Sequence, residues 1–268
     1  MKGYFFLLGI RLDALNISAA VSRIEGWLAP GSKKKTSYVC ISNVNNVVEA
    51  QKNPLFKRIQ NEADLSVCDG MPLVWSARLR GLKLNERVYG LALMQQMLRG
   101  GEEKGYRNYF YGSTEEVLKA MVSKIRSQYP KLEICGFYSP AFRPLTEAEK
   151  ESIVKDINNS GADIVWVGLG CPKQEIWMYE FKDRLSCPVL IGVGAAFDFF
   201  AGTKKQAPVF IQKSGFEWLF RLCSEPKRLW RRYLINNSIF IILLLKELIC
   251  SVFTFPISLR SKAIPSRK

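Results

Sequence analysis

Short apolar runs alternate with amphipathic segments along residues 3–202. The runs are rich in Val, Ile, Tyr and Phe and end at Gly, Asn or Asp, which is typical of buried strands. The segments between them repeat apolar residues at helical spacing, and several follow a capping residue such as Asn16. Strands and helices that alternate along residues 3–202 predict an α/β fold: a Rossmann-like parallel sheet with helices on both faces.

The predicted elements can be placed by residue number. Strands are expected at residues 3–10, 38–42, 109–111, 133–137, 163–169 and 188–193, with another through Leu65 and Val67. Helices are expected at residues 17–28, 43–51, 55–59, 71–79, 91–98, 146–158 and 174–181, with another through Val117, Met121 and Ile125. The apolar stretch 3–10 has no small-residue cleavage site after it, so we interpret it as a strand rather than a signal peptide. We expect one α/β body over residues 1–202.

The remaining residues, 203–268, predict a helical, basic extension. From residue 201 onward 13 Lys and Arg stand against 3 Glu, within a whole-chain net charge of +15. Residues 234–245 carry no charge, but Lys246 and Glu247 interrupt the apolar run before it reaches the ~20 residues of a spanning helix. This pattern favours an interfacial helix on an anionic membrane surface. A core helix or a homo-oligomer interface is the alternative.

Three features of composition exclude classes of chemistry. His is absent, which removes His-based acid–base catalysis, Ser-His-Asp triads and His-ligated metals. The seven Cys include no CxxC pair, which argues for a reducing compartment and against a disulfide framework. No Asp-x-Asp pair is present to hold a divalent ion. We therefore expect a mechanism that needs neither a metal nor a cofactor.

Residues 63–73 are the stretch around which the rest is organised, because an apolar run there ends in Asp69 and Gly70. A buried strand would deliver the Asp69 carboxylate to the carboxyl edge of the sheet, where ligands bind in open α/β folds. Asp69 is therefore a candidate catalytic base. The alternative is that Asp69 only caps the helix that begins near Met71.

Three glycine-containing turns are further candidates. Gly112 and Ser113 precede a helix and could form a phosphate or nucleotide cradle, although Gly-Ser-Thr turns also simply start helices. The run 168–175 places Lys173 and Gln174 at a helix start, but it lacks the third glycine of the dinucleotide motif and could be an ordinary tight turn. The run 192–198 allows close backbone approach and ends in a carboxylate that could hold a sugar hydroxyl or cap a turn. Its candidates are Gly194 and Asp198.

With these residues in view, residues 4–233 resemble the WecG/TagA/CpsF family of bacterial glycosyltransferases. The resemblance rests on five ordered blocks and a C-terminal pattern. The blocks are Ser42-Asn43, Asp69-Gly70, residues 86–90 (Glu-Arg-Val-Tyr-Gly), residues 170–175 (Gly-Cys-Pro-Lys-Gln-Glu) and residues 192–202, and the pattern is Trp218, Arg221, Glu225-Pro226 and Arg228.

The resemblance implies metal-independent transfer of a sugar, with inversion, from a UDP-sugar to a polyprenyl-diphosphate-linked saccharide for cell-surface polysaccharide. It implies a peripheral location on the cytoplasmic face of the bacterial membrane. Asp69 would take the proton of the acceptor hydroxyl, and Gln174 would hold the donor. Arg87 and the C-terminal arginines Arg221 and Arg228 would stabilise the departing UDP.

One departure from the family pattern concerns the first block. Many members carry Thr two residues before the Asn, and here that position is Ile41. Either the adjacent Ser42 hydroxyl serves instead or the donor is handled differently. The alternative function is a non-catalytic basic module that binds RNA or acidic lipid. A nucleic-acid binder should show basic residues interleaved with exposed aromatics across one face, whereas here the arginines cluster beside an apolar helical tail, which favours the membrane.

Overall fold

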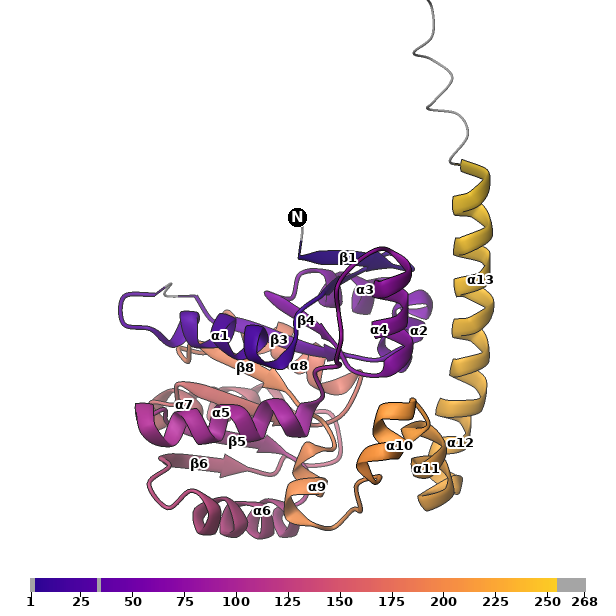
Figure 1. The fold of residues 1–268 in the computed structure, drawn as a ribbon. Coiled ribbons are helices and arrows are strands. Elements are labelled where there is room, and N and C mark those ends of the chain that lie inside the picture. Colours follow the sequence, from indigo (N-terminus) through magenta and orange to yellow (C-terminus); the bar gives the residue numbers. More distant parts are fainter. Residues whose placement is uncertain (1–2, 33–34, 255–268) are drawn as a thin grey trace, which may run out of the picture.

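Parallel strands form the centre of the molecule (Figure 1). The computed structural model describes residues 3–32 and 35–254, and in this part of the chain eight strands share one sheet in the order β1-β2-β4-β3-β8-β7-β5-β6. All neighbours pair in parallel except β1 with β2, which confirms the predicted α/β fold. The strands are β1 Tyr4–Leu7, β2 Ile10–Asp13, β3 Ser37–Ser42, β4 Leu65–Cys68, β5 Asn108–Gly112, β6 Ile134–Tyr138, β7 Ile164–Gly168 and β8 Val189–Gly192.

The edge of the sheet corrects one prediction. Residues 3–10 do not form a single strand, because the chain reverses at Leu8 and Gly9 and pairs Leu7 with Ile10 in an antiparallel hairpin. Leu8 and Gly9 both have positive φ, at 51° and 73°, as a two-residue turn matched to the strand twist requires. The side chains of Gln51 and Asn61 donate to the carbonyls of this turn. The run is continuously apolar, so hydropathy alone hides the turn.

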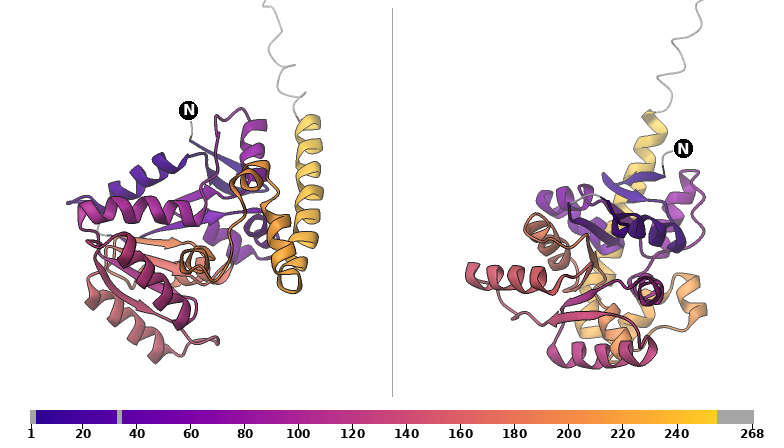
Figure 2. Two further views of the ribbon diagram at one scale, coloured as in Figure 1. Left: turned by 60° about the horizontal axis from the view of Figure 1, so that its bottom comes forward. Right: turned by 90° about the vertical axis from the view of Figure 1, so that its left-hand side faces the viewer.

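Helices cover both faces of the sheet (Figure 2). One face carries α1, α5, α6 and α9, and the other carries α3, α7 and α8. Alternation along β3 illustrates the division, since Val39 and Ile41 face the first set while Tyr38 and Cys40 face the second. The body helices are α1 Ile17–Leu28, α2 Val44–Lys52, α3 Pro54–Asn61, α4 Met71–Leu79, α5 Gly90–Lys104, α6 Glu115–Gln128, α7 Glu147–Ser160, α8 Lys173–Phe181 and α9 Ala196–Ala201.

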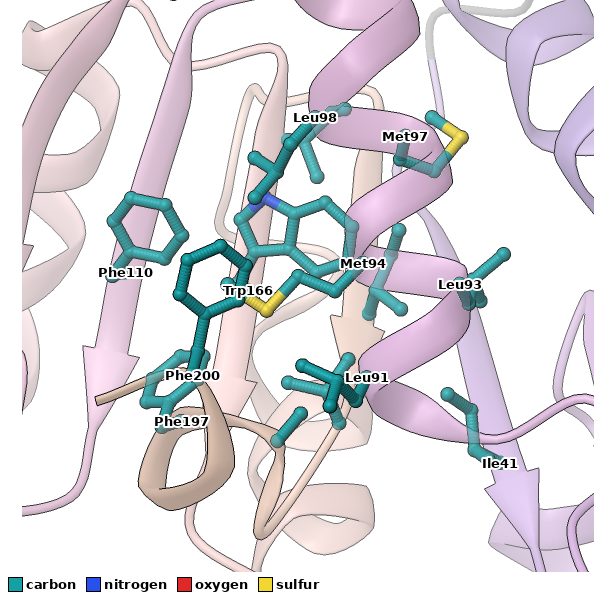
Figure 3. Close-up of a cluster of buried hydrophobic side chains, with 14 of the residues drawn as sticks. Ile41, Leu91, Leu93, Met94, Met97, Leu98, Phe110, Trp166, Phe197 and Phe200 are labelled. Atoms are coloured by element: carbon teal, nitrogen blue, oxygen red, sulfur yellow. The ribbon is translucent and has the colours of Figure 1, made fainter. Parts of the chain in front are cut away.

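The largest buried side chain lies where α5 and α9 meet the sheet (Figure 3). Trp166 on β7 is fully buried against Met94 and Phe197, and its indole N–H donates to Asn108 Oδ1 at 2.9 Å. A hydrogen-bond partner for the N–H removes the desolvation cost of burying an indole. The same cluster contains Ile191 and Val193, so it packs against the carboxyl end of β8, directly before Gly194.

The C-terminal helices follow directly after α9 and run up one side of the body (Figure 1). The first of them, α10, begins at Val209, seven residues after the boundary at 202 that the sequence predicts. Phe240 is buried in a cluster with apolar side chains of α2, α4 and the β1–β2 hairpin, so the last helix is docked on the body. The helices are α10 Val209–Ser214, α11 Glu217–Ser224, α12 Pro226–Trp230, the π-helical η1 Arg231–Ile235 and α13 Asn236–Thr254.

Polar contacts hold α13 against the body at both ends. Asn236 bonds with Asn45 and Lys52 on α2, and Glu247 accepts from the Leu8 amide and pairs with Arg80. The continuous helix from Pro226 to Cys250 is, by length and composition, long and apolar enough to cross a membrane. The predicted apolar run ends at Lys246 and Glu247, whereas in the structure α13 continues through both charges, so the uncharged run 234–245 underestimates the length of the helix. Lys33 and Lys34, and residues 255–268 of the extension, lie outside the described residues.

Candidate active site

The carboxyl ends of β3, β4, β7 and β8 meet at one edge of the sheet and surround a crevice. From β3 the chain continues to β4 on one side, while β8 and β7 lie on the other, so the crevice is a topological switch point. Asn43 follows β3, Asp69 follows β4, Gly170 follows β7 and Gly194 follows β8. Four segments that are distant in sequence are thereby brought together.

Asp69 does not cap α4. The N-cap is Gly70, at φ 107°, and no side chain bonds to the first turn of that helix. The capping alternative is thus wrong for this residue. The Asp69 side chain, about one-quarter exposed, instead accepts from Arg87, with Oδ1 lying 3.4 Å from Nη1. A positive φ at position 70 needs glycine, which explains the Asp-Gly pair without any cap.

Arg87 joins the body to the C-terminal helices. Its second terminal nitrogen donates to Glu217 at 2.5 Å and to Gln212 at 3.1 Å, and its guanidinium lies 4.6 Å from the centre of the Tyr89 ring. Two carboxylates from different parts of the chain therefore share one guanidinium. Because its charge is already compensated by Asp69 and Glu217, Arg87 orients these carboxylates rather than offering a free cation to a ligand.

Burial changes the acidity of Asp69. Desolvation raises the pKa of its carboxyl to about 6, Arg87 opposes this rise, and the nearby Glu217 adds to it. A pKa one unit below neutral leaves about nine-tenths of the group ionised at pH 7. The carboxylate is thus charged at neutral pH and yet more basic than an exposed Asp, as a general base requires.

Two cavities of different character meet at Asp69. A small one, of about 90 Å³, lies over the crevice and includes Ile41, Gln174 and Gly194 among its lining. A larger one, of about 550 Å³, runs between α4 and α13 and is lined on its long sides by apolar residues. Both cavities are bordered by Asn43, Asp69, Glu217, Arg221 and Arg232.

Arg232 is the site residue that the sequence reasoning missed. It borders both cavities, and its Nε is buried without a hydrogen-bond partner among the described residues. Arg221 is its neighbour at the same border and lies 5.5 Å from the ring of Phe199. The cluster of arginines was visible in the sequence, but only helix geometry decides which of them turn toward the body.

The side-chain amides of Asn46 and Gln174, which line the small cavity, are held by a buried carboxyl group. Glu175 on α8 is fully buried and accepts from Asn46 Nδ2 at 2.9 Å and from Gln174 Nε2 at 3.1 Å. Gln174 in turn accepts from the Gly170 amide at 3.1 Å. The glycines of the run 192–198 leave room for this side chain, since a Cβ on Gly192 would lie 3.1 Å from Gln174 Nε2.

Ser42 does not serve the site, which corrects the sequence interpretation. Its hydroxyl is fully buried, bonds to Gln60 at 2.7 Å and lies 3.0 Å from Ser66 Oγ. Successive residues of a strand point to opposite faces, so Ile41 and Asn43 reach the small cavity while Ser42 points away from it. The neighbouring hydroxyl therefore cannot take the place of a side chain at position 41.

Five other candidates border neither the small nor the large cavity. Gly112 is needed for strand packing, because a Cβ there would lie 2.7 Å from the Gly168 backbone, and Ser113 follows it. Thr114 caps α6, as the alternative for this turn proposed. The other three are exposed or paired locally: Lys173 is exposed, Asp198 pairs with Lys204, and Arg228 pairs with Glu225.

Comparison with known proteins identifies one family of glycosyltransferases. The model of the glycosyl transferase WecG/TagA/CpsF family matches residues 5–252. Proteins named N-acetylglucosaminyldiphosphoundecaprenol N-acetyl-beta-D-mannosaminyltransferase are similar in Bacillus spizizenii (30% identity, 75% of this chain and 76% of the relative), Bacillus subtilis (32%, 72% and 74%) and Staphylococcus aureus (27%, 84% and 86%). With a match that spans nearly the whole described chain, this protein belongs to the WecG/TagA/CpsF family of glycosyltransferases.

Proposed function

We propose that this glycosyltransferase moves a sugar from a UDP-sugar to a saccharide on a polyprenyl diphosphate, with inversion and without a metal ion. The observation that carries the proposal is the meeting of a small amide-lined cavity and a long apolar cavity at one carboxylate, Asp69. The curated relatives are named for transfer of N-acetylmannosamine to N-acetylglucosaminyl-diphosphoundecaprenol, which supports an acceptor of this chemical class.

The donor is assigned to the small cavity over the crevice. Its lining offers amide groups from Asn43, Asn46 and Gln174 and backbone around Gly194, which suit the hydroxyl and carbonyl groups of a nucleotide sugar. The location follows the general rule that nucleotides bind outside the carboxyl ends of parallel strands at a switch point.

The lipid acceptor is assigned to the long cavity. Trp75 and Leu79 of α4 face Phe240 and Leu244 of α13 across it, and the polar end of the groove is the border that contains Asp69. An apolar groove that ends at arginines suits a molecule with a hydrocarbon chain and a diphosphate. This arrangement would bring the acceptor hydroxyl to the carboxylate.

The chemistry then needs only groups of this chain. Asp69 takes the proton of the acceptor hydroxyl, and the resulting oxygen attacks the anomeric carbon while the bond to the UDP oxygen breaks. Arg221 and Arg232 are placed to stabilise the charge that develops on UDP, and Arg87 holds the Asp69 carboxylate in position. Guanidinium groups in this role support a reaction without a divalent ion.

The exposed face of α13 is proposed to rest on the cytoplasmic membrane surface. Ile242, Leu245 and Ile249 are each more than half exposed, and the opposite face of the helix is docked on the body. A helix with one face on a protein and the other apolar and exposed is suited to the interface plane. Lipid acceptors would enter the groove from that side.

A donor panel tests the proposal. Purified protein is incubated with several UDP-sugars, a lipid-diphosphate-linked N-acetylglucosamine acceptor and either magnesium or a chelator. Transfer that persists with the chelator and disappears in Asp69→Asn supports the proposal. Transfer that requires a divalent ion contradicts the metal-independent part, and the absence of transfer from every UDP-sugar contradicts the donor class. A non-catalytic basic module does not fit a chain that belongs to a family of glycosyltransferases.

A further inference from the structure

Glu175 stands out among the buried ionisable groups because the transfer chemistry does not use it. It lies on the first turn of α8, is fully buried, and borders neither the small nor the large cavity at Asp69. Yet it contacts two residues that do line the donor cavity, Asn46 and Gln174. A buried carboxylate without an ion-pair partner is costly, so its presence calls for a reason.

Both hydrogen bonds to Glu175 are accepted by the same carboxyl oxygen. Oε1 accepts from Asn46 Nδ2 at 2.9 Å and from Gln174 Nε2 at 3.1 Å, whereas Oε2 is buried with no hydrogen-bond partner among the described residues. The two amides come from different turns, since Asn46 is on α2 after β3 and Gln174 is on α8 after β7. Glu175 thus ties together the two walls of the donor cavity.

The carboxylate also decides which way the amides face. Oε1 accepts whether the carboxyl is ionised or carries its proton on Oε2, so both amides turn their NH₂ groups toward Oε1 and their oxygens away. The oxygen of Gln174 then accepts from the Gly170 amide at 3.1 Å, and that of Asn46 accepts from the Asn43 amide at 3.3 Å. The second contact completes the capping box of α2, whose N-cap is the cavity residue Asn43.

We propose that Glu175 is a positioning residue for the donor: it fixes the amide orientation of Gln174 and Asn46 so that each offers a defined donor and acceptor to the sugar nucleotide. The proposal rests on the assignment of the small cavity to the UDP-sugar. Glu175 touches no reacting atom, and no proton leaves or enters it during transfer. Burial raises the pKa of this carboxyl, which fits a group that acts through hydrogen bonds rather than as a counter-ion.

Three variants separate positioning from other roles. Glu175→Leu removes the acceptor and frees both amides to flip, while Glu175→Gln keeps a carbonyl oxygen that can accept from both. Glu180→Leu is the matched control on the same helix, because Glu180 is partly exposed and pairs only with Lys150 among the described residues. The measurements are the donor KM and kcat of each variant, UDP binding by calorimetry and the melting temperature.

The expected result is a rise in donor KM of about tenfold or more for Glu175→Leu with a smaller fall in kcat, and a KM within about twofold of wild type for Glu175→Gln. Glu180→Leu should match wild type. A wild-type KM in Glu175→Leu overturns the proposal, and so does a KM in Glu175→Gln that is raised tenfold, which would assign the role to charge. If Glu175→Leu does not fold, the KM of Glu175→Gln alone decides.

Failure of the donor assignment gives a different result. If the wild-type protein neither transfers from a UDP-sugar nor binds UDP in the calorimeter, the proposed function fails and Glu175 is not implicated. If the wild type binds UDP and Glu175→Leu binds it equally well, only the positioning role fails.

Discussion

Asp69 Oδ1 lies 3.4 Å from Arg87 Nη1, and the same guanidinium donates to Glu217 at 2.5 Å. Through Arg87, Asp69 at the end of β4 is connected to Glu217 on α11. The carboxylate at the sheet edge is therefore held in part by the C-terminal helices, which also line the apolar groove. Desolvation outweighs this ion pair and raises the pKa of Asp69. A charged, basic and oriented carboxylate follows from the competition between burial, which raises the pKa of Asp69, and nearby arginines, with Arg87 first among them, which lower it.

Replacing Asp69 with Asn should abolish the proton transfer and keep the fold. We expect kcat to fall by about 10²–10⁴-fold, the usual contribution of a general base, while UDP binding by calorimetry is retained. The melting temperature at pH 7.5 should not decrease. The stability contributed by a raised pKa is present below the unfolded value of 3.8 and is lost as the pH rises through about 6, so a neutral side chain costs nothing at pH 7.5. Residual activity near the wild-type rate would remove Asp69 from the mechanism.

The pH dependence of transfer should report the same group. With the Asp69 pKa raised to about 6, kcat/KM should be level above pH 7 and fall toward tenfold per pH unit below pH 6, as the base becomes protonated. An exposed Asp would place this fall near pH 4. A profile that is still level at pH 5 would contradict the assignment.

Truncation of Arg232 should weaken transfer strongly. Its guanidinium borders both cavities and its Nε has no partner among the described residues, so Arg232→Ala removes an uncommitted cation beside the departing diphosphate. We expect a loss of about 10²-fold in kcat/KM. Arg231→Ala is the control, because this exposed neighbour stacks on Trp230 and should lose less than about threefold. Equal losses in both variants would indicate a general effect of charge.

Ser42 should matter for stability and not for substrate. Ser42→Ala leaves Gln60 Oε1 without its donor in a buried setting, which should cost about 1–3 kcal/mol of unfolding free energy. The donor KM should stay unchanged, because the side chain points away from the small cavity. Denaturant unfolding and initial-rate kinetics on the same preparation provide both values. A raised KM at unchanged stability would restore Ser42 to the site.

Charges placed on the exposed face of α13 should weaken membrane binding. The double variant Ile242→Glu/Leu245→Glu alters two residues that are 53% exposed, so the fold should tolerate it while its partition onto anionic vesicles falls by about tenfold or more. Phe142→Glu is the control, since Phe142 is 82% exposed but belongs to the body. Sedimentation with vesicles measures both. Unchanged sedimentation of the double variant would make the interfacial interpretation wrong.

Much of the fold follows from local pattern. The helix predicted at 71–79 agrees with α4, and the helix start predicted after Asn16 agrees with α1. Both predictions succeed because apolar periodicity and helix capping depend only on residues close together in the sequence. The hairpin at Leu8 and Gly9 was missed, since a turn inside an apolar run leaves no hydropathy signal. The predicted apolar run ends at Lys246 and Glu247, but α13 continues through both residues to Thr254.

The sequence by itself determined the alternation of parallel strands and helices in the body, the lack of His, and a carboxylate placed after a buried strand at Asp69. Only the tertiary structure decided that Asp69 turns to Arg87, that Ser42 faces Gln60, and that Arg232 reaches the crevice. The physical reason is that burial and side-chain direction depend on packing between segments far apart in the chain. The sequence gives the type of each side chain, but its exposure to solvent, its hydrogen-bond partners and its pKa depend on the segments that pack around it.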